Sequence, residues 1–323
     1  MYSLLLRAFK GATMHFSHTI NGVKSWVDIY QSIEAFEPLI KVIFTHHGLR
    51  YSKIENLTPG SNAVFRVDDF VIKIFSPIEA GLTTDKVFHI EKAALEHVNN
   101  LILSPNLLYS GSIYDKYTFQ YIIMNHINAQ SFIEKKKRYI TIDKRCFATS
   151  IKEITNRINV PIENTIIPTI TKKDCFENSR WNNFPKSFCE ERVAIIKKMS
   201  FVNPVYVHSD LKASNVMIGE NEEIYLIDFA DSHIAPASYE WPFIVFGLFG
   251  CDKEMMEAYF TTNYQNESFY IQLTYALLMH KFGAFILMQI CELTKTATDA
   301  IVNVEILYQL IIQCLQNGNI LIS

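Results

Sequence analysis

A chain of 323 residues is long enough for one large domain or two moderate domains with an ample hydrophobic core. Hydrophobic residues make up 49% and charged residues 20% of the sequence, a composition that excludes extensive disorder. The formal net charge of −3 gives no support for nucleic-acid binding, so we expect no nucleic-acid partner.

Six cysteines lie at scattered positions, without a C-x-x-C pair or a histidine spacing typical of zinc sites. This usage indicates reduced cysteines and a cytoplasmic location. The stretch Ser268–Cys291 is long enough to cross a bilayer, but Lys281 near its middle would be costly there. We therefore expect a buried helix or helix pair over this stretch, and no membrane partner.

Residues 1–50 are expected to form an N-terminal helical extension. Ser25–Asp28 is suited to capping a helix whose apolar residues, from Ile29 to Ile43, recur at spacings of three and four. Gly48 is a suitable stop signal for that helix.

From residue 51 the hydrophobic pattern changes. The turn Thr58–Asn62, which contains Gly60-Ser61-Asn62, precedes two predicted strands, Ala63–Val67 and Phe70–Phe75. Such a small-residue loop lets backbone N–H groups approach phosphates, although the chain contains no P-loop sequence. Lys73 lies inside the second strand, where a solvated face is the ordinary place for a lysine.

The next elements mix helix and strand. The amphipathic run Val87–Val98 predicts a helix, and Leu101–Leu108 and Thr118–Met124 complete a small β-rich lobe. Residues 149–170 are rich in turn formers and are interpreted as an insertion near an acceptor site.

The most informative stretch runs from Val205 to Asp231. It predicts a short strand, a polar loop, and a hairpin formed by Val216–Ile218 and Ile224–Ile227. The polar side chains at the mouth of this hairpin are His208, Asp210, Lys212, Asn215 and Asp228.

Two carboxylates and a carboxamide in this arrangement suit phosphoryl transfer. One carboxylate accepts the proton of the attacking hydroxyl, and separate oxygen ligands hold the Mg²⁺ that neutralises a triphosphate. Asp210 suits the base, and Asn215 with Asp228 suits the metal, because Mg²⁺ prefers hard oxygens and few protein ligands. The alternative interpretation is a surface hairpin with solvated acidic side chains.

Downstream of Trp241 the sequence predicts helices without internal repeats or low-complexity linkers. We expect them to form one helical lobe. The predicted helices are Phe243–Gly250, Lys253–Phe260, Ser268–Cys291 and Asp299–Gln316.

These motifs resemble the aminoglycoside phosphotransferase and choline kinase-like branch of the protein-kinase-like superfamily. His208–Asn215 matches the catalytic-loop pattern H-x-D-x-x-x-x-N, and Asp228-Phe229-Ala230 follows thirteen residues later in place of D-F-G. Gly60–Val67 resembles the G-x-x-N-x-V-[YF]-x-V loop of the aminoglycoside phosphotransferases. Only twelve residues separate Asp228 from Glu240, fewer than the activation segment of eukaryotic protein kinases needs.

The resemblance implies an α+β, bilobal protein-kinase-like fold. Residues 51–127 would form the small, β-rich, nucleotide-binding N-lobe. Residues 128–323 would form the larger, mainly helical C-lobe with the catalytic loop and the acceptor site. ATP and Mg²⁺ would bind in the cleft between the lobes.

In the N-lobe, the resemblance assigns phosphate contacts to the loop Gly60-Ser61-Asn62 and to Lys73, which would pair with the α- and β-phosphates. Glu91 would orient Lys73, with Glu96 as the competing candidate. The residues whose backbone would bind adenine are Asn125 and Ile127.

In the C-lobe, the resemblance implies that His208 and Glu240 brace the catalytic loop, although Glu240 also suits a helix N-terminus. Lys212 resembles the D-L-K-x-x-N of protein Ser/Thr kinases and would neutralise the γ-phosphate. Ser209 replaces the glycine of H-G-D, at little cost if its backbone angles are ordinary. Ala230 replaces the glycine of D-F-G, which removes some backbone freedom.

The predicted function is transfer of the ATP γ-phosphate to a hydroxyl of a small molecule, an aminoglycoside or another alcohol. Asp210 would be the base and Asn215 with Asp228 would hold Mg²⁺. The alternatives are an atypical protein Ser/Thr kinase, favoured by Lys212 and opposed by the short segment after Asp228, and a non-catalytic nucleotide-binding protein.

The uneven distribution of charge bears on the acceptor. Residues 201–323 contain four lysines and no arginine against fourteen acidic residues, a net charge of −10, whereas residues 1–200 carry +7. This asymmetry is compatible with a triphosphate on the basic part and a cationic acceptor on the acidic part. Alternatively, the acidic residues belong to the metal site and to solvated helix faces.

Overall fold

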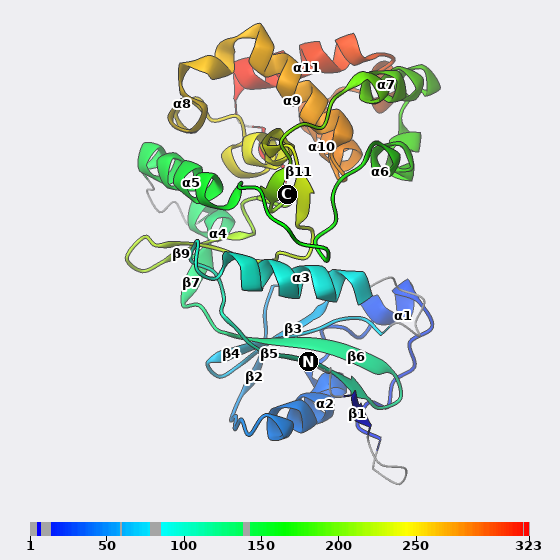
Figure 1. Ribbon diagram of the computed structural model, residues 1–323, viewed down its shortest axis with the longest axis vertical. Helices are drawn as coiled ribbons and strands as arrows, with labels where there is room; N and C mark the ends of the chain where they lie inside the picture. The colour runs from blue at the N-terminus through cyan, green and yellow to red at the C-terminus, as the bar shows by residue number, and fades with distance from the viewer. Residues whose placement is uncertain are drawn as a thin grey trace. The chain divides into compact units, whose positions relative to one another are not determined.

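The computed structural model describes residues 5–7, 14–58, 60–77, 85–137, 143–318 and 320–322. The chain divides into two compact units. The N-unit comprises Met1–Asn100 and Ser104–Asn128, and the C-unit comprises Leu101–Leu103 and Ala129–Ser323. The N-unit is built on a β-sheet and the C-unit is mainly helical, so the predicted α+β class is confirmed (Figure 1).

The described part of the N-unit contains a six-stranded sheet in the order β1-β5-β6-β4-β3-β2. Its strands are β1 Leu5–Arg7, β2 Ile54–Asn56, β3 Ala63–Val67, β4 Phe70–Ile74, β5 Leu107–Tyr114 and β6 Thr118–Asn125. Strand β1 runs parallel to β5, and the other neighbours are antiparallel. The predicted strands Ala63–Val67 and Phe70–Phe75 are therefore confirmed as β3 and β4.

Helices cover both faces of this sheet (Figure 1). Helix α3 (Asp85–Val98), which confirms the helix predicted over Val87–Val98, lies on one face, and α2 (Ile33–His46) lies on the other. The short helix α1 spans Val23–Val27.

Residues before position 50, predicted as an N-terminal helical extension, contribute to the N-unit core. Phe16 is fully buried, and its ring centroid lies 5.2 Å from that of Phe36 and 4.9 Å from that of Phe119 on β6. The apolar face of α2 buries these aromatic rings against the sheet, which stabilises both elements by removing apolar area from water.

The helix predicted with apolar residues from Ile29 to Ile43 is present as α2, but its predicted cap is wrong, because Ser25–Asp28 lies at α1. The structure has two helices, α1 and α2, separated between Asp28 and Ser32. Ser32 caps the second one, because its Oγ accepts the N–H of Ala35 at 3.2 Å. The predicted stop is confirmed, since α2 ends at His46 and Gly48 has a φ of 66°.

The C-unit holds two small sheets among its described residues, ordered β10-β9-β7 and β11-β8. Its strands are β7 Ala129–Ser131, β8 Val205–Val207, β9 Val216–Gly219, β10 Ile224–Leu226 and β11 His233–Ala235. Strands β9 and β10 form the predicted hairpin, with Met217 opposite Tyr225. The sequence did not predict β11, which pairs with β8.

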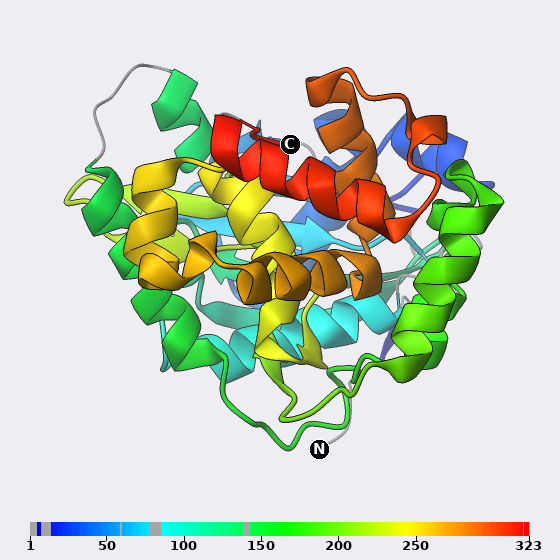
Figure 2. The same cartoon turned by 90° about the horizontal axis from the view of Figure 1, so that it is seen from above.

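Helices form the rest of the C-unit. Helix α5 packs against α8, and α9 packs against α10 and α11 (Figure 2). The α-helices are α4 Phe132–Lys137, α5 Lys144–Ile158, α6 Lys172–Phe176, α7 Lys186–Lys198, α8 Lys253–Phe260, α9 Glu267–Met279, α10 Gly283–Thr294 and α11 Val304–Asn317. Phe243–Phe249 is a π-helix, and short 3₁₀ helices span Ser179–Asn183, Ala237–Glu240, Thr261–Gln265 and Thr298–Ala300.

Two expectations for this unit need comment. Residues 149–158, expected to be turn-rich, belong to α5, because Phe147, Ile151 and Ile158 form a buried face at helical spacing. The predicted helix pair over Ser268–Cys291 is confirmed as α9 and α10.

Among the described residues, no single helix is both long and apolar enough to cross a membrane. One bent pair, α9 and α10 at 117°, meets the requirement by length and composition alone.

A buried arginine ties three helical segments of the C-unit together. Arg192 on α7 is 2% exposed, and its Nε donates to the Leu278 carbonyl at 2.8 Å. Its terminal nitrogen donates to the Cys175 carbonyl at 2.8 Å, and the guanidinium lies 4.4 Å from the centre of the Trp181 ring. The guanidinium thus satisfies carbonyl groups at the ends of α9 and α6.

Replacement of Arg192 by leucine should lower the free energy of unfolding by about 3 kcal/mol, because two buried carbonyls lose their donors. Urea denaturation of the full-length protein measures this loss. The matched control is Arg157→Leu on the exposed side of α5, which should change stability by no more than about 0.5 kcal/mol. Equal losses in the two variants would contradict the bracing role of Arg192.

Candidate active site

In the N-unit, the structure joins Lys73 to Glu91. Lys73 lies on β4, and its Nζ is 2.9 Å and 2.7 Å from the two carboxylate oxygens of Glu91 on α3. Both side chains are buried, so Lys73 does not lie on a solvated strand face. Glu96, the competing candidate, is exposed and lies 3.9 Å from Lys92. The predicted pairing of Lys73 with Glu91 is confirmed.

The loop Gly60-Ser61-Asn62 is held by a residue from the N-terminal region. The indole Nε1 of Trp26 donates to the Ser61 carbonyl at 2.9 Å, and the Asn62 side chain is buried. Pro59, in the predicted turn, lies outside the described residues. Trp26 therefore fixes the backbone of the predicted phosphate loop, a contact that no motif in the sequence indicates.

The predicted adenine-binding segment lies at the end of β6. Asn125 is the last residue of that strand, and its Oδ1 accepts the N–H of Asn106 at 2.6 Å. None of the described residues accepts the N–H of Ile127. The backbone N–H of Asn125 donates to the Asn106 carbonyl at 3.3 Å. The adenine contact of these two residues stays a prediction.

In the C-unit, Asn215 and Asp210 are joined at the mouth of the β9–β10 hairpin. The Asn215 Nδ2 donates to the backbone carbonyl of Asp210 and to its Oδ2, both at 2.8 Å. The Lys212 Nζ lies 3.6 Å from the other carboxylate oxygen of Asp210. Since the amide nitrogen of Asn215 is used by Asp210, a cation would meet its Oδ1, which also accepts the Ser214 hydroxyl at 3.4 Å.

The backbone of the catalytic loop is anchored by a buried carboxylate. Glu240 is 1% exposed and accepts the backbone N–H groups of His208 and, at 3.2 Å, of Ser209. The role predicted for Glu240 is confirmed. Glu240 also lies directly before the helical residues that begin at Trp241, so its place at a helix N-terminus holds as well.

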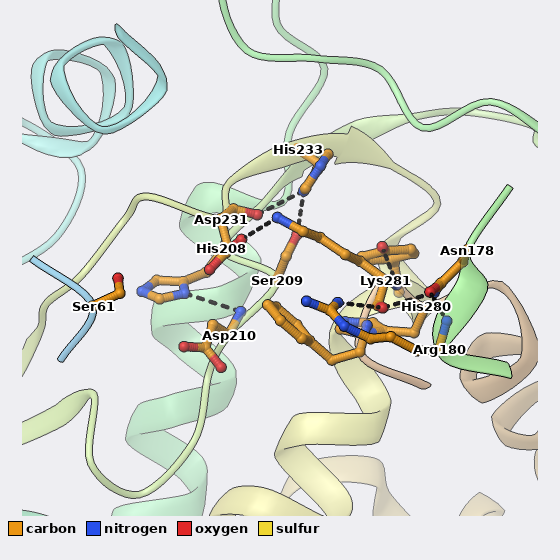
Figure 3. Close-up of polar contacts among 12 residues, drawn as sticks. Ser61, Asn178, Arg180, His208, Ser209, Asp210, Asp231, His233, His280 and Lys281 are labelled. Atoms are coloured by element: carbon orange, nitrogen blue, oxygen red, sulfur yellow. Dashed lines mark hydrogen bonds and ion pairs between the residues drawn. The ribbon is translucent and has the colours of Figure 1, made fainter. Parts of the chain in front are cut away.

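The His208 ring and the π-helix support the same loop. The Nε2 of His208 donates to the Ile227 carbonyl at 3.1 Å. Its Nδ1 accepts the N–H of Asp210 at 3.3 Å (Figure 3). The N–H of Ala213 donates to the Gly247 carbonyl at 2.9 Å. A Cβ on Gly247 would lie 3.1 Å from that of Lys212, so only glycine allows this close approach.

The electrostatics of the loop suit a proton acceptor. Burial raises the pKa of Asp210 to about 7, while nearby Lys212 lowers it and the carboxylates of Asp228 and Asp231 raise it. A carboxylate whose pKa lies near neutrality can both accept and return a proton at physiological pH.

The residues present also fit a magnesium ion. Mg²⁺ is usually held by one or two carboxylate or amide oxygens together with phosphates and waters. The Oδ1 of Asn215 and the carboxylate of Asp228 are such ligands. Among the described residues there is no cluster of three or more His, Cys, Asp or Glu side chains that would suit a caged metal instead.

Two residues of this site adopt left-handed backbone conformations. Ser209 has a φ of 66° and Asp228 a φ of 63°. The replacement of glycine by Ser209 was expected to cost little only if the backbone angles were ordinary, and they are not. Glycine would adopt this conformation without strain, whereas serine does not. Such strain is typical of functional sites whose surroundings hold the chain in place.

A polar network beside the loop was missed from the sequence. Lys281, at the break between α9 and α10, lies 2.5 Å from the Asp231 carboxylate, and its backbone N–H donates to the Tyr239 hydroxyl at 2.7 Å (Figure 3). His233 lies beside Asp231 (Figure 3). Lys281 interrupts an apolar run, and that isolated charge was the only signal in the sequence.

No protein-family model and no curated protein matches the sequence. Solved structures do match, among them the aminoglycoside phosphotransferase APH(2″)-IIIa with GDP and kanamycin, at 15% identity and a TM-score of 0.60 over 86% of this chain and 98% of that one. APH(2″)-IIa with streptomycin and ATP matches at 14% identity, with a TM-score of 0.56 over 80% and 96%. Spectinomycin phosphotransferase with ADP and spectinomycin matches at 15% identity, with a TM-score of 0.54 over 87% and 93%. The chain therefore has the fold of the aminoglycoside phosphotransferases, as the motifs predicted.

Replacement of Ser209 by glycine should raise the free energy of unfolding by about 1 kcal/mol, because it relieves the left-handed strain. Its costs are the 3.3 Å contact from Ser209 Oγ to His233 and the greater freedom of glycine in the unfolded chain. The matched control is Ser200→Gly, at a loop position without a positive φ, which should not stabilise the protein. Urea denaturation compares the two variants, and equal effects would refute the assignment of strain to Ser209.

A second prediction concerns acid stability. Burial lowers the pKa of His280 well below its usual value of 6.5. The unfolded chain takes up a proton below pH 6.5 and the folded chain does not, so this residue makes stability fall as the pH falls.

The variant His280→Asn keeps an acceptor for the Phe282 N–H, which donates to His280 Nδ1 at 3.0 Å. Between pH 7.5 and pH 5 the wild type should lose about 2 kcal/mol of stability relative to this variant. Urea unfolding at both pH values measures this change. A stability difference independent of pH would contradict a neutral His280 in the folded state.

Proposed function

We propose that this protein is an ATP-dependent phosphotransferase that transfers the γ-phosphoryl group to a hydroxyl of a small molecule. The observation that most supports this proposal is the hydrogen bonding between Asn215 and Asp210, in which the amide nitrogen of Asn215 orients the carboxylate of Asp210. The ATP, ADP and GDP bound by structures of the same fold, and their small-molecule acceptors, support this reading.

In the proposed reaction, Asp210 accepts the proton of the acceptor hydroxyl while the hydroxyl oxygen forms a bond to the γ-phosphorus. The bond from that phosphorus to the β,γ-bridging oxygen breaks, and ADP leaves with the electron pair. Lys73, held by Glu91, contacts the α- and β-phosphates, and Lys212 lies beside Asp210, where it can neutralise the γ-phosphate. These residues act by positioning and charge neutralisation.

Asn215 and Asp228 are the residues that would hold Mg²⁺, which when bound neutralises charge on the phosphates. The loop Gly60-Ser61-Asn62 would supply phosphate contacts, and the backbone of Asn125 and Ile127 would bind adenine. His208 and Glu240 brace the loop and have no proposed contact with the reacting atoms.

The second candidate is an atypical protein Ser/Thr kinase, which the position of Lys212 beside Asp210 favours. The two functions differ in what becomes labelled when ATP carries a radioactive γ-phosphate. Small hydroxyl compounds take up the label in the first case. In the second case the protein itself or an added protein is labelled, and Asp210→Asn abolishes the labelling.

Replacement of Asp210 by asparagine should lower kcat for acceptor phosphorylation about 10³-fold, because the general base is lost. The KM for ATP should stay within about threefold of the wild type, since Asp210 is not a nucleotide ligand. The matched control is Asp299→Asn, at an exposed carboxylate, which should keep full activity. Steady-state kinetics with a panel of hydroxyl compounds measures both. An unchanged kcat in the Asp210 variant would contradict the proposed role of this residue.

A further inference from the structure

A cavity of about 430 Å³ lies in the C-unit beside the catalytic loop. It is connected to that loop through His233, because the Nδ1 of His233 lies 3.3 Å from Oγ of Ser209, the residue before Asp210. Its size falls in the range of small-molecule sites. The lining includes Ile170, Asp174, His233, Tyr239, Met279 and Lys281.

His233 presents a hydrogen-bond acceptor to this cavity. The residue is 8% exposed, and its contacts with Ser209 Oγ and with the Asp231 carbonyl, at 2.6 Å, both use Nδ1. A carbonyl can only accept, so Nδ1 carries the proton and Nε2 does not. Nε2 has no partner among the described residues. Burial also lowers the pKa of His233 to about 4, which keeps the ring neutral.

Lys281 presents a donor of fixed position. Its Nζ is 2.5 Å from Asp231, and its carbonyl accepts from Asn178 at 2.8 Å and from Arg180 at 3.2 Å. The backbone N–H of Lys281 donates to the Tyr239 hydroxyl. Hydrogen bonds therefore hold the backbone N–H, the backbone carbonyl and the ammonium of this residue. The charge of its ammonium is compensated by the carboxylate of Asp231.

The acidic side chains of the cavity are also engaged. Asp174 accepts the N–H of Thr171 at 2.9 Å and its hydroxyl at 2.6 Å, and Glu177 lies 3.8 Å from Lys173. Since Lys281, Asp174 and Glu177 all have partners within the protein, none of these lining charges is left without a counter-group to offer a charged ligand. An uncharged ligand with several hydroxyl groups suits such a lining, because a hydroxyl can donate to His233 and accept from Lys281.

We propose that this cavity binds the phosphoryl acceptor and that the acceptor is an uncharged polyhydroxylated compound. One of its hydroxyls donates to His233 Nε2, and another of its oxygens accepts from Lys281. This inference rests on the proposed phosphotransferase function. It departs from the cationic acceptor expected from the charge asymmetry.

The first test compares sugars with the amino sugars of the same skeleton as acceptors. Wild-type kcat/KM should favour the uncharged member of each pair at least tenfold. Lys281→Met leaves Asp231 uncompensated and should shift this ratio at least tenfold toward the amino sugars. The double variant Asp231→Asn with Lys281→Met is the matched control and should return the ratio toward the wild-type value. Effects on Asp210 itself cancel, because each ratio is taken within one variant.

A second test addresses His233. His233→Asn keeps a donor for the Asp231 carbonyl but has no hydrogen-bond acceptor at the position of Nε2. The KM for the phosphoryl acceptor should therefore rise at least tenfold. His233→Gln places an amide oxygen nearer the position of Nε2 and should recover part of this loss. A purely structural role would instead lower the melting temperature and raise the KM for ATP and for the acceptor together.

The outcomes separate this inference from the proposed function. Wild-type preference for amino sugars, or a ratio that Lys281→Met does not change, overturns the inference and leaves the phosphotransferase intact. The inference is also overturned, and the phosphotransferase left intact, if ATP hydrolysis depends on Asp210 but no uncharged polyhydroxylated compound is phosphorylated. If the protein does not turn over Mg·ATP, the proposed function fails. Calorimetric titration of the wild type with the same sugars then tests the cavity, and absence of binding overturns the inference.

Discussion

The position of Asp210 depends on a carboxylate that takes no part in the proposed chemistry. Glu240 is buried and accepts the N–H groups of two successive residues, His208 and Ser209. Successive backbone donors converge in this way where one residue is left-handed, as Ser209 is. The strained turn and the buried carboxylate therefore stabilise each other. Loss of either would leave polar groups in the interior without partners.

The parts of the site that the sequence predicts are those that depend on short sequence motifs. The β9–β10 hairpin follows from two apolar runs around a turn. The pairing of Lys73 with Glu91 was implied by the resemblance to the kinase-like series of motifs. Each depends on contacts between neighbouring elements or on one motif whose spacing is fixed by the chemistry. The order of these motifs was enough to predict the fold class.

The parts that could not be predicted depend on contacts distant in the chain. Lys281 meets Asp231 fifty residues away, and Trp26 holds Ser61 thirty-five residues away. Neither pair has a local pattern, because packing of whole elements brings them together. The left-handed backbone conformation of Ser209 could not be predicted either, because the sequence gives no sign that this serine differs from an ordinary loop residue. The conformation depends on the contact with Glu240, which is distant in the chain.

The charge asymmetry shows why counts along the chain are a poor guide to what a ligand meets. Lys144 on α5 lies 2.5 Å from Asp252, and Arg145 lies 3.6 Å and 3.3 Å from Glu254 and Glu257 on α8. Part of the acidic half is therefore offset by basic residues that precede position 200 within the same unit. At physiological salt, exposed charges act over about 8 Å. The field in the cavity is then set by the few groups that line it, and the one cation among its lining residues is Lys281, placed there by the break between α9 and α10.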